Sequence, residues 1–535
     1  MASLDEVSVD QIVLLLRCSK AFQFTLKKFG PGNGSRFSPE LKLESLFRKL
    51  MIRDYVQSLK DIPILRHQWI NAAKEEDGFQ RSGFYPFVRI KAQNRWLTFD
   101  GILVTNGIKS LKLFYLHKRE RVTKLDSFLA PSEYKILQLQ DVEQLDHFHL
   151  VTSKSDDYSG FHEESINKRI EFHLRNKIRP LVEQAQKIGK LRQLLPIIPG
   201  GQCRIHSEDE CPYSIPCLKE DVKQVPIQRN NLLRFKTLAS RDKYDLIKRD
   251  IWFADELPLS LQLKRNEQIV HDCEGKNRRH IEPAKVRAWL EKQGLRLKDL
   301  KTPLIFLDFE AYNFPYRIAP ESDGHGYLPF QYSYYIQYPG TKSAESADRI
   351  FTDFSHDIRR QFCDQLLRDI MPAVNRQGKV VVYNKSFEDQ RLKELGERFP
   401  DSSDSLTRIS AALVDLAEPF RRFYVYLPGQ LGSYSLKAIL APLMILWPRH
   451  AKRLISKNYS ELAIKGGMAS VRGYTLLAWM RRTQEQSIHS ENRIKILQQK
   501  LIDYCQLDSH CMVDILQVLN SIAEVDEINI RESNN

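Results

Sequence analysis

The sequence of residues 303–310 is Pro-Leu-Ile-Phe-Leu-Asp-Phe-Glu, and it decides the fold of the second half of the chain. Its apolar part predicts a short buried strand that ends in two acids, Asp308 and Glu310. Side chains two positions apart lie on one face of a strand, so these carboxylates would be neighbours where desolvation and mutual repulsion oppose them. A divalent cation makes the pair favourable, because Mg²⁺ and Mn²⁺ prefer hard oxygen ligands. The stretch therefore predicts a metal site.

The composition indicates a folded, multidomain protein with a polyanionic partner. A length of 535 residues predicts about two to four domains. A content of 42% hydrophobic and 10% aromatic residues excludes a disordered chain. The 81 Lys and Arg residues outnumber the 67 Asp and Glu residues, which gives a net charge of +14. This excess favours nucleic acid as the partner, ahead of an acidic membrane surface; the alternative is a merely soluble basic surface.

The chain has no apolar run of the ~18 residues that a membrane span requires. Acids occur early, at Asp5 and Glu6, and the apolar stretch 12–16 is too short for a secretion signal. We therefore expect a cytoplasmic protein with no membrane partner. In a reducing compartment the eight cysteines favour thiols or metal ligands over disulfides.

The patterns along the chain predict two α/β domains with a helical connector between them. Residues 1–220 form the first domain, 221–298 the charged connector, 299–525 the second domain and 526–535 a polar tail. Within the connector, residues 283–293 predict an amphipathic helix, because Pro283 suits a first turn and Gly294 a stop.

Further acids accompany Asp308 and Glu310 in the second domain. The apolar run 379–383 predicts a strand, and Asn384 leads from it into a helix whose first turn carries Glu388. Residues 501–508 predict a helix on which Tyr504 and Asp508, four positions apart, share a face.

Several stretches in this order carry a family resemblance. They are Leu307-Asp308-Phe309-Glu310, Pro329-Phe330-Gln331-Tyr332-Ser333, Tyr383-Asn384-Lys385-Ser386-Phe387-Glu388, Gly432-Ser433-Tyr434-Ser435-Leu436-Lys437 and Tyr504-Cys505-Gln506-Leu507-Asp508. Together they resemble the tyrosine branch (DEDDy) of the DnaQ-like 3′–5′ exonucleases. More closely, they are similar to the bacterial domain of unknown function 2779 (DUF2779) family.

The resemblance implies an RNase H-like, DnaQ-type domain with a mixed sheet, which holds two Mg²⁺ or Mn²⁺ ions. Asp308 would bridge the ions, with Glu310 and Asp508 as flanking ligands and Glu388 as the outer acid. Tyr504 would orient the attacking water, because a phenol is a poor base at neutral pH but a good hydrogen-bond partner. Most relatives carry Asp where this chain has Glu388, and the neighbouring Asp389 is the alternative ligand.

Other residues of the same motifs are candidates for binding substrate. Phe309 or Phe387 would stack on terminal bases, and Asn384 belongs to the same motif as Phe387. Lys437 would hold a phosphate, unless it is simply solvated. Asp415, at the end of another apolar stretch, is expected to support the site rather than to bind metal.

The cysteines of the first domain suggest a second metal centre. Cys18 lies in a helix predicted over residues 9–29, whereas Cys203, Cys211 and Cys217 cluster behind a Pro-Gly-Gly loop. This split pattern resembles the iron–sulfur RecB-like (PD-(D/E)XK) nucleases, in which four thiolates hold a [4Fe–4S] cluster. A zinc site of Cys203, His206, Cys211 and Cys217 is the alternative, as are reduced core cysteines.

A RecB-like nuclease also needs an Asp followed by Glu-x-Lys on the next strand. Asp100 fits the first position and Lys118 the last, but Leu116 occupies the position of the acid. Leucine cannot bind a cation. We therefore predict that this site is degenerate and that the domain holds nucleic acid.

These patterns predict a metal-dependent 3′–5′ exonuclease that releases nucleotides from single-stranded DNA or RNA. One alternative is a non-catalytic nucleic-acid-binding component of a repair or defence complex. A second alternative is a PD-(D/E)XK endonuclease centred on Asp100 and Lys118. The motifs specify no protein partner.

Overall fold

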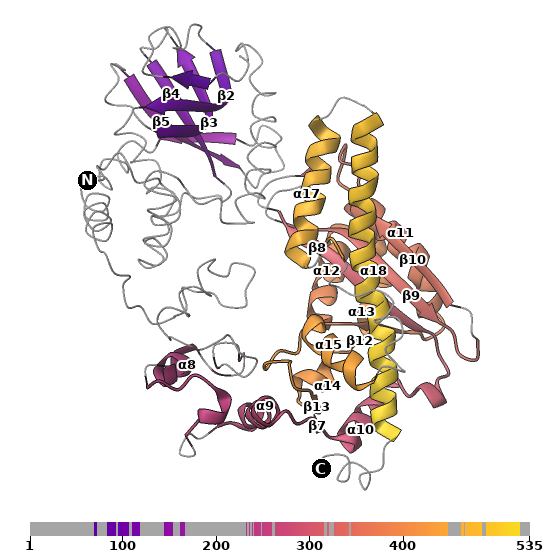
Figure 1. The fold of residues 1–535 in the computed structure, drawn as a ribbon. Helices are drawn as coiled ribbons and strands as arrows, with labels where there is room; N and C mark the ends of the chain where they lie inside the picture. Colours follow the sequence, from indigo (N-terminus) through magenta and orange to yellow (C-terminus); the bar gives the residue numbers. More distant parts are fainter. Residues whose placement is uncertain are drawn as a thin grey trace. The chain divides into compact units, whose positions relative to one another are not determined.

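The computed structural model describes most of residues 232–314, 326–447 and 462–524, and the backbone of six strands between residues 69 and 165 (Figure 1). Contacts divide the chain into two units. The first comprises Met1–Gln224 and Phe314–His325, and the second comprises Val225–Asn313 and Gly326–Asn535.

In the first unit the six described strands form one sheet in the order β1-β2-β3-β4-β5-β6. They are β1 (Trp69–Asn71), β2 (Gly83–Ala92), β3 (Arg95–Thr105), β4 (Ser110–His117), β5 (Gln144–Thr152) and β6 (Phe161–Ser165). The β1–β2 and β4–β5 pairs are parallel, and the other three pairs are antiparallel. Asp100 lies on β3 and Leu116 on β4. The other predicted site residues of this unit, Cys18, Lys118, Cys203, Cys211 and Cys217, lie outside the described residues.

The described part of the second unit begins with helices. They are α8 (Ser240–Ile247), the short η7 (Ala254–Glu256), α9 (Arg265–Lys276), α10 (Pro283–Gln293) and η8 (Leu297–Asp299). The helix predicted at 283–293 is confirmed: Pro283 opens it, and Gly294 ends it with a φ of +69°. The Arg287 guanidinium donates to the Ala523 carbonyl oxygen at 2.8 Å, so α10 packs against the end of the chain's longest described helix.

A five-stranded mixed sheet forms the centre of the second unit, in the order β10-β9-β8-β11-β12. Its strands are β8 (Leu304–Asn313), β9 (Tyr327–Gln337), β10 (Ala344–Ile350), β11 (Lys379–Val382) and β12 (Leu413–Asp415). β8, β9 and β10 are antiparallel neighbours, whereas β11 and β12 run parallel to β8. A separate ribbon pairs β7 (His280–Ile281) with β13 (Val425–Tyr426). The expected mixed α/β architecture of this part of the chain is confirmed.

In the described part of this unit, seven further α-helices surround the sheet (Figure 1). They are α11 (Arg359–Val374), α12 (Lys385–Arg398), α13 (Ser403–Ala412), α14 (Glu418–Arg421), α15 (Leu436–Leu446), α17 (Gly467–Thr483) and α18 (Ile488–Glu524). A short η9 (Pro400–Ser402) joins α12 to α13. Among the described helices, none combines the length and the apolar character that crossing a membrane requires.

The alternation of side chains along β8 explains how the sheet is buried. Leu304 and Phe306 belong to the same core cluster as Met512 of α18. Phe309 points to the other face, where its ring lies 5.5 Å from that of Phe362 on α11. Because the side-chain period of a strand is two, the even-numbered face of β8 lies under α18. Asp308 is therefore directed toward α18.

Candidate metal centre

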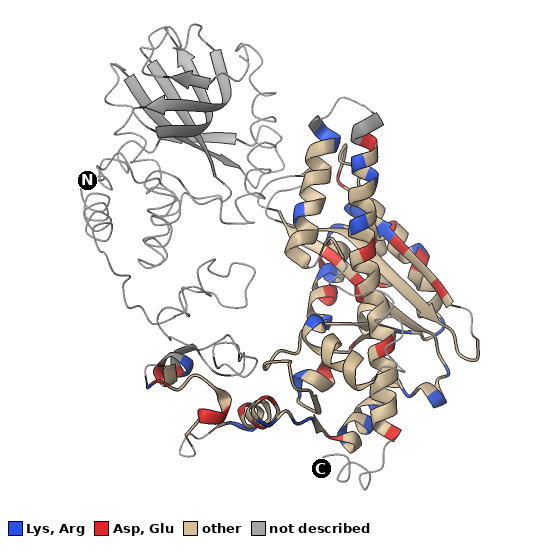
Figure 2. Ribbon diagram, in the orientation of Figure 1, with Lys and Arg blue, Asp and Glu red and all other residues tan. Residues whose placement is uncertain are grey.

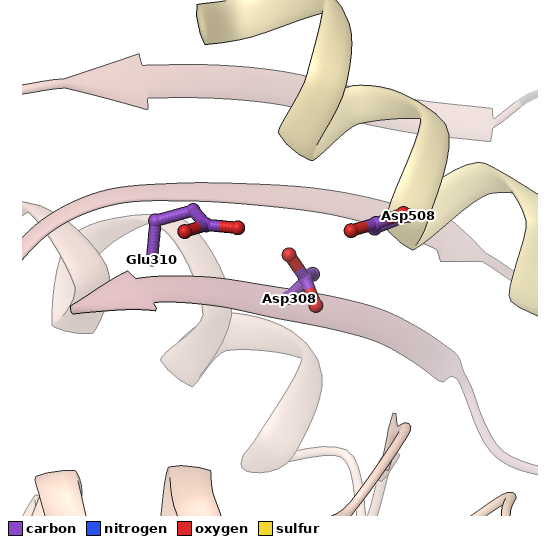
Figure 3. Close-up of side chains that lie close together, drawn as sticks. All are labelled: Asp308, Glu310 and Asp508. Carbon is purple, nitrogen blue, oxygen red and sulfur yellow. The ribbon is translucent and has the colours of Figure 1, made fainter. Parts of the chain in front are cut away.

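Three carboxylates converge between β8 and α18. Oxygen atoms of Asp308, Glu310 and Asp508 all lie within 4.8 Å of one another (Figure 3). Glu310 is 8% exposed and Asp508 is 7% exposed. The structure thus brings Asp508 together with acids that lie 198 and 200 residues before it in the sequence.

A polar network holds α18 in register above the sheet. Ser333 of β9 pairs with Asp308 across the strands. The Ser333 hydroxyl lies 2.7 Å from the Ser509 hydroxyl and donates to Asp348 Oδ1 at 2.6 Å. Gln506 Nε2 donates to Asp348 Oδ2 at 2.7 Å. Ser509 directly follows Asp508 on α18, so these bonds determine where the Asp508 carboxylate meets β8.

Glu388 adds a fourth carboxylate from the first turn of α12. It is 2% exposed, and its Oε2 has no hydrogen-bond partner within the described part of the chain. Burial, and then the negative charge of Asp308, raise the pKa of Glu388 well above its usual value. A buried polar atom without a partner is costly, which makes this oxygen available to a cation.

The neighbouring acid Asp389 has a different environment. Its carboxylate bonds the Lys393 ammonium at 2.6 Å and accepts a hydrogen bond from the Ser410 hydroxyl. These partners lower the pKa of Asp389. The helix therefore directs Glu388, rather than Asp389, toward Asp308.

The pKa values of the three convergent acids show how unfavourable their charges are without a cation. Burial and the charge of Glu310 raise the pKa of Asp308 well above its usual value, and burial with the charge of Asp308 does the same for Asp508. Burial and the charge of Asp508 raise the pKa of Glu310 to about 8. The Lys437 ammonium opposes the shift of all three acids. This all-oxygen donor set fits Mg²⁺ or Mn²⁺.

Tyr504 and Lys437 lie at the edge of the carboxylates. Tyr504 is one turn before Asp508 on α18 and is 4% exposed. Lys437 extends from the start of α15, with its Nζ 5.1 Å from the centroid of the Tyr504 ring. The structure therefore brings both predicted residues to the site.

Cys505 contacts Asp308, and we did not predict this contact from the sequence. Its Sγ lies 3.5 Å from Asp308 Oδ2, within reach of a weak hydrogen bond. Burial and the charge of Asp308 raise the pKa of the Cys505 thiol well above its usual value, so the thiol stays protonated and donates. Its place inside the Tyr504–Asp508 turn was the available signal.

The remaining motif residues fall into two groups. Asn384 caps α12 with a φ of +82°, and its backbone N–H donates to Asp415 Oδ1 at 3.1 Å. The Asp415 carboxylate also accepts from Arg421 at 2.8 Å, so it stabilises the turn beside Glu388. Phe309, in contrast, is 4% exposed and packs under α11. The structure does not bring Phe309 to the carboxylates.

Phe387 lies between the site and the surface. Its ring meets that of Tyr327 edge-on at 6.3 Å, and the Arg391 guanidinium lies 5.1 Å from its centroid. Because Phe387 directly precedes Glu388, this aromatic pair borders the carboxylates.

Comparison with known proteins gives one family match. Residues 305–435 match the model of the family described as Domain of unknown function (DUF2779). This match supports the DUF2779 family. The matched DUF2779 segment includes Asp308, Glu310 and Glu388, whereas Tyr504 and Asp508 follow it in the chain.

One similar curated protein is the uncharacterized protein UU173 of Ureaplasma parvum serovar 3. It is 24% identical over 225 residues, which cover 37% of this chain and 30% of the relative. The chain thus spans less than a third of that relative. No solved structure matches the chain.

Proposed function

We propose that the chain is a metal-dependent 3′–5′ exonuclease that hydrolyses phosphodiester bonds of single-stranded DNA or RNA. The observation that carries the proposal is the convergence of Asp308, Glu310 and Asp508 within 4.8 Å. The partnerless oxygen of Glu388 beside them strengthens it.

The topology of the sheet supports the DnaQ-like, RNase H-like form of this proposal. Three antiparallel strands, β10, β9 and β8, are followed by two strands parallel to β8. The strand that carries the first two acids is the central one. This is the arrangement that the family resemblance implies.

Asp308, Glu310, Glu388 and Asp508 would hold the two Mg²⁺ or Mn²⁺ ions. When bound, such ions supply an activated water and neutralise charge on the attacking and leaving oxygens. The Lys437 ammonium beside the same acids would bind a phosphate oxygen. The phenol of Tyr504 would orient water by hydrogen bonding.

The substrate would be guided by basic and aromatic side chains. The chain carries a net charge of +14, and basic residues occur along α17 and in the first part of α18 (Figure 2). Arg481 and Arg482 belong to the last turn of α17. Phe387 and Asn384 border the carboxylates and would contact the terminal nucleotide.

For the first unit we propose a RecB-like domain that binds nucleic acid. Its antiparallel β2–β3–β4 strands, followed by the parallel β5, support this architecture. Cys18, Cys203, Cys211 and Cys217 would hold a [4Fe–4S] cluster, with zinc as the alternative. Anaerobic purification should give a brown protein with broad visible absorption. A colourless protein with stoichiometric zinc would contradict the cluster.

The nuclease proposal is tested with purified full-length protein, Mn²⁺ and end-labelled oligonucleotides. We expect a ladder of shortened products from wild type and none from Asp308→Ala. Asp389→Ala, which removes an acid adjacent to Glu388 but outside the cluster, is the matched control and should retain cleavage. Cleavage that survives Asp308→Ala but is lost in Lys118→Ala would place the activity in the first unit instead.

A further inference from the structure

The loop between β13 and α15 presents an exposed aromatic side chain close to the carboxylates. Tyr434 is 45% exposed, and Tyr327 is the other aromatic among the exposed large hydrophobic residues of the described chain. Within the described residues the Tyr434 ring makes no ring contact, cation–π contact or side-chain hydrogen bond. Its side chain therefore contributes little to packing.

The backbone of this loop, in contrast, is tightly fixed. Glu274 of α9 is 8% exposed, and its carboxylate accepts bonds from the backbone N–H groups of Gly429 and Leu431, each at 2.9 Å. The same carboxylate accepts the Tyr426 hydroxyl at 2.7 Å, and Gly432 N–H donates to that hydroxyl oxygen at 2.8 Å. One buried acid thus holds Gly429 and Leu431 directly and Gly432 through the Tyr426 hydroxyl.

Positive φ angles let the loop turn its N–H groups toward Glu274. Gly429 has a φ of +97°, Leu431 of +53° and Gly432 of +73°. Glycine adopts this region without strain, but Leu431 does not. Successive N–H groups in such a conformation form an anion-binding concavity, which Glu274 fills.

A second set of bonds fixes the segment that carries Tyr434. Gln430 is 2% exposed, accepts from Leu427 N–H at 2.6 Å and donates to the Ser433 carbonyl at 3.1 Å. The Tyr383 hydroxyl donates to the carbonyl of Tyr434 itself at 2.5 Å. The loop is therefore held from α9, from within and from the end of β11.

The same segment leads directly into the site. Three residues after Tyr434, Lys437 acts electrostatically on Asp308, Glu310 and Asp508. Tyr383, which holds the Tyr434 carbonyl, directly precedes Asn384 in the turn before Glu388. The fixed loop that carries the exposed ring thus borders the carboxylate site through Lys437 and Tyr383.

We infer that Tyr434 is a stacking platform for a nucleobase of the single strand whose end enters the carboxylate site. This inference rests on the proposed function and extends it to a named binding residue. Stacking accepts any base, because every base has a π-face. Fixing the loop in advance lowers the ordering cost of binding, which explains why so many bonds stabilise a segment whose aromatic side chain is 45% exposed. Glu274 is then a positioning residue for this platform.

The test measures binding in EDTA, so that it does not depend on hydrolysis. Single-stranded oligonucleotides carry fluorescent 2-aminopurine at one of the last four 3′ positions, and full-length protein is titrated against each. We expect quenching at one of these positions with wild type and with Tyr434→Phe. Tyr434→Ala should lose that quenching and bind about 5- to 150-fold more weakly, the range of one base–aromatic stack.

Two controls make the result specific. Ile445→Ala removes another exposed apolar side chain of the same region, 74% exposed, and should bind as wild type does. An oligonucleotide with an abasic residue at the responsive position should bind wild type and Tyr434→Ala equally. Melting temperatures close to wild type verify that both variants fold.

Three outcomes separate the possibilities. Unchanged affinity and quenching in Tyr434→Ala would overturn the inference, and so would an equal loss of affinity with the abasic strand. A loss of affinity seen only with intact bases would support the platform. If wild type then showed no cleavage with Mn²⁺, only the nuclease proposal would fail. Cleavage by wild type with no binding effect of Tyr434→Ala would sink the platform and leave the nuclease.

Discussion

Two regions of the second unit bury carboxylates, and their surroundings differ. Glu274 accepts hydrogen bonds from Tyr426 and from the N–H groups of Gly429 and Leu431. The cluster of Asp308, Glu310, Glu388 and Asp508 instead brings acids against one another, and an oxygen of Glu388 has no partner among the described residues. Glu274, Glu310, Glu388 and Asp508 are each at most 8% exposed, whereas Asp308 is half-buried.

The comparison shows that burial alone does not mark a functional acid. A carboxylate whose charge is satisfied by donors is a structural element, because its bonds exist only in the folded state. A carboxylate that is buried against like charges disfavours its own ionised form, and a cation is the simplest remedy. The two regions should therefore respond in opposite ways to neutralisation, and only the repelling acids should respond to metal.

The largest expected effect is that of Asp308→Asn. It should lower exonuclease activity by at least about 10³-fold, because metal-assisted stabilisation of a transition state is worth several kcal/mol. It should also raise the melting temperature in EDTA at pH 8, because a repelling charge is removed. Activity assays and thermal melts measure both. A variant that is inactive and also less stable without metal would show that Asp308 acts in folding.

The next effect is on the pH dependence of stability. In the metal-free fold the pKa of Glu310 is raised to about 8, and those of Asp308 and Asp508 are raised as well. A raised pKa means that the folded state binds protons more tightly than the unfolded state. The resulting stability is fully present below the unfolded value near 4 and is lost as pH rises toward 8.

Thermal melts in EDTA should therefore show falling stability from about pH 5 to pH 8, and Mg²⁺ or Mn²⁺ should restore it mainly at the upper end. Glu310→Gln removes one titrating group and should flatten the profile. A cation effect that is equal at pH 5 and pH 8 would count against binding at these acids.

The sequence predicted the strand and the helix that carry the site residues, but its local patterns did not predict that these two elements meet. The apolar run before Asp308 and the four-residue spacing of Tyr504 and Asp508 indicated a strand and a helix by periodicity alone, and both are confirmed. That α18 crosses β8 depends on long-range bonds such as Ser333 to Ser509, which no local pattern encodes. The family resemblance, rather than the spacing, supplied that link.

Two residues show where sequence reasoning fell short. The burial of Phe309 could have been predicted, because adjacent side chains of a strand lie on opposite faces of the sheet. Phe309 therefore faces away from Asp308, and strand alternation already argued against a stacking role at the site. Glu274 had no such signal. Its partner N–H in Gly429 lies 155 residues away, and a single acid on a charged helix is ordinarily solvated.

A smaller effect distinguishes the adjacent acids Glu388 and Asp389. Glu388→Gln should reduce activity or metal affinity by about 10- to 100-fold, the range for residues that complete or tune a metal site. Asp389→Asn should leave both within about twofold of wild type and cost only part of its bond to Lys393, a surface pair of small energy. Steady-state rates at several Mn²⁺ concentrations measure the difference. A reversed order would make Asp389 the ligand.

The smallest effect is expected from Glu274→Gln, and it sharpens the contrast. The amide keeps the shape of the side chain but presents N–H donors to a loop that supplies only donors, so at least one bond becomes a repulsive contact. We expect a loss of about 1–3 kcal/mol in unfolding free energy, the cost of an unsatisfied buried group. Unlike Asp308→Asn, this loss should be the same with and without Mn²⁺, because Glu274 is not among the convergent acids. Denaturant melts of wild type, Glu274→Gln and Asp308→Asn, with and without Mn²⁺, measure this directly. If Glu274→Gln instead stabilised the metal-free protein, Glu274 would belong with the repelling acids, and the distinction between a satisfied and an unsatisfied buried carboxylate would fail.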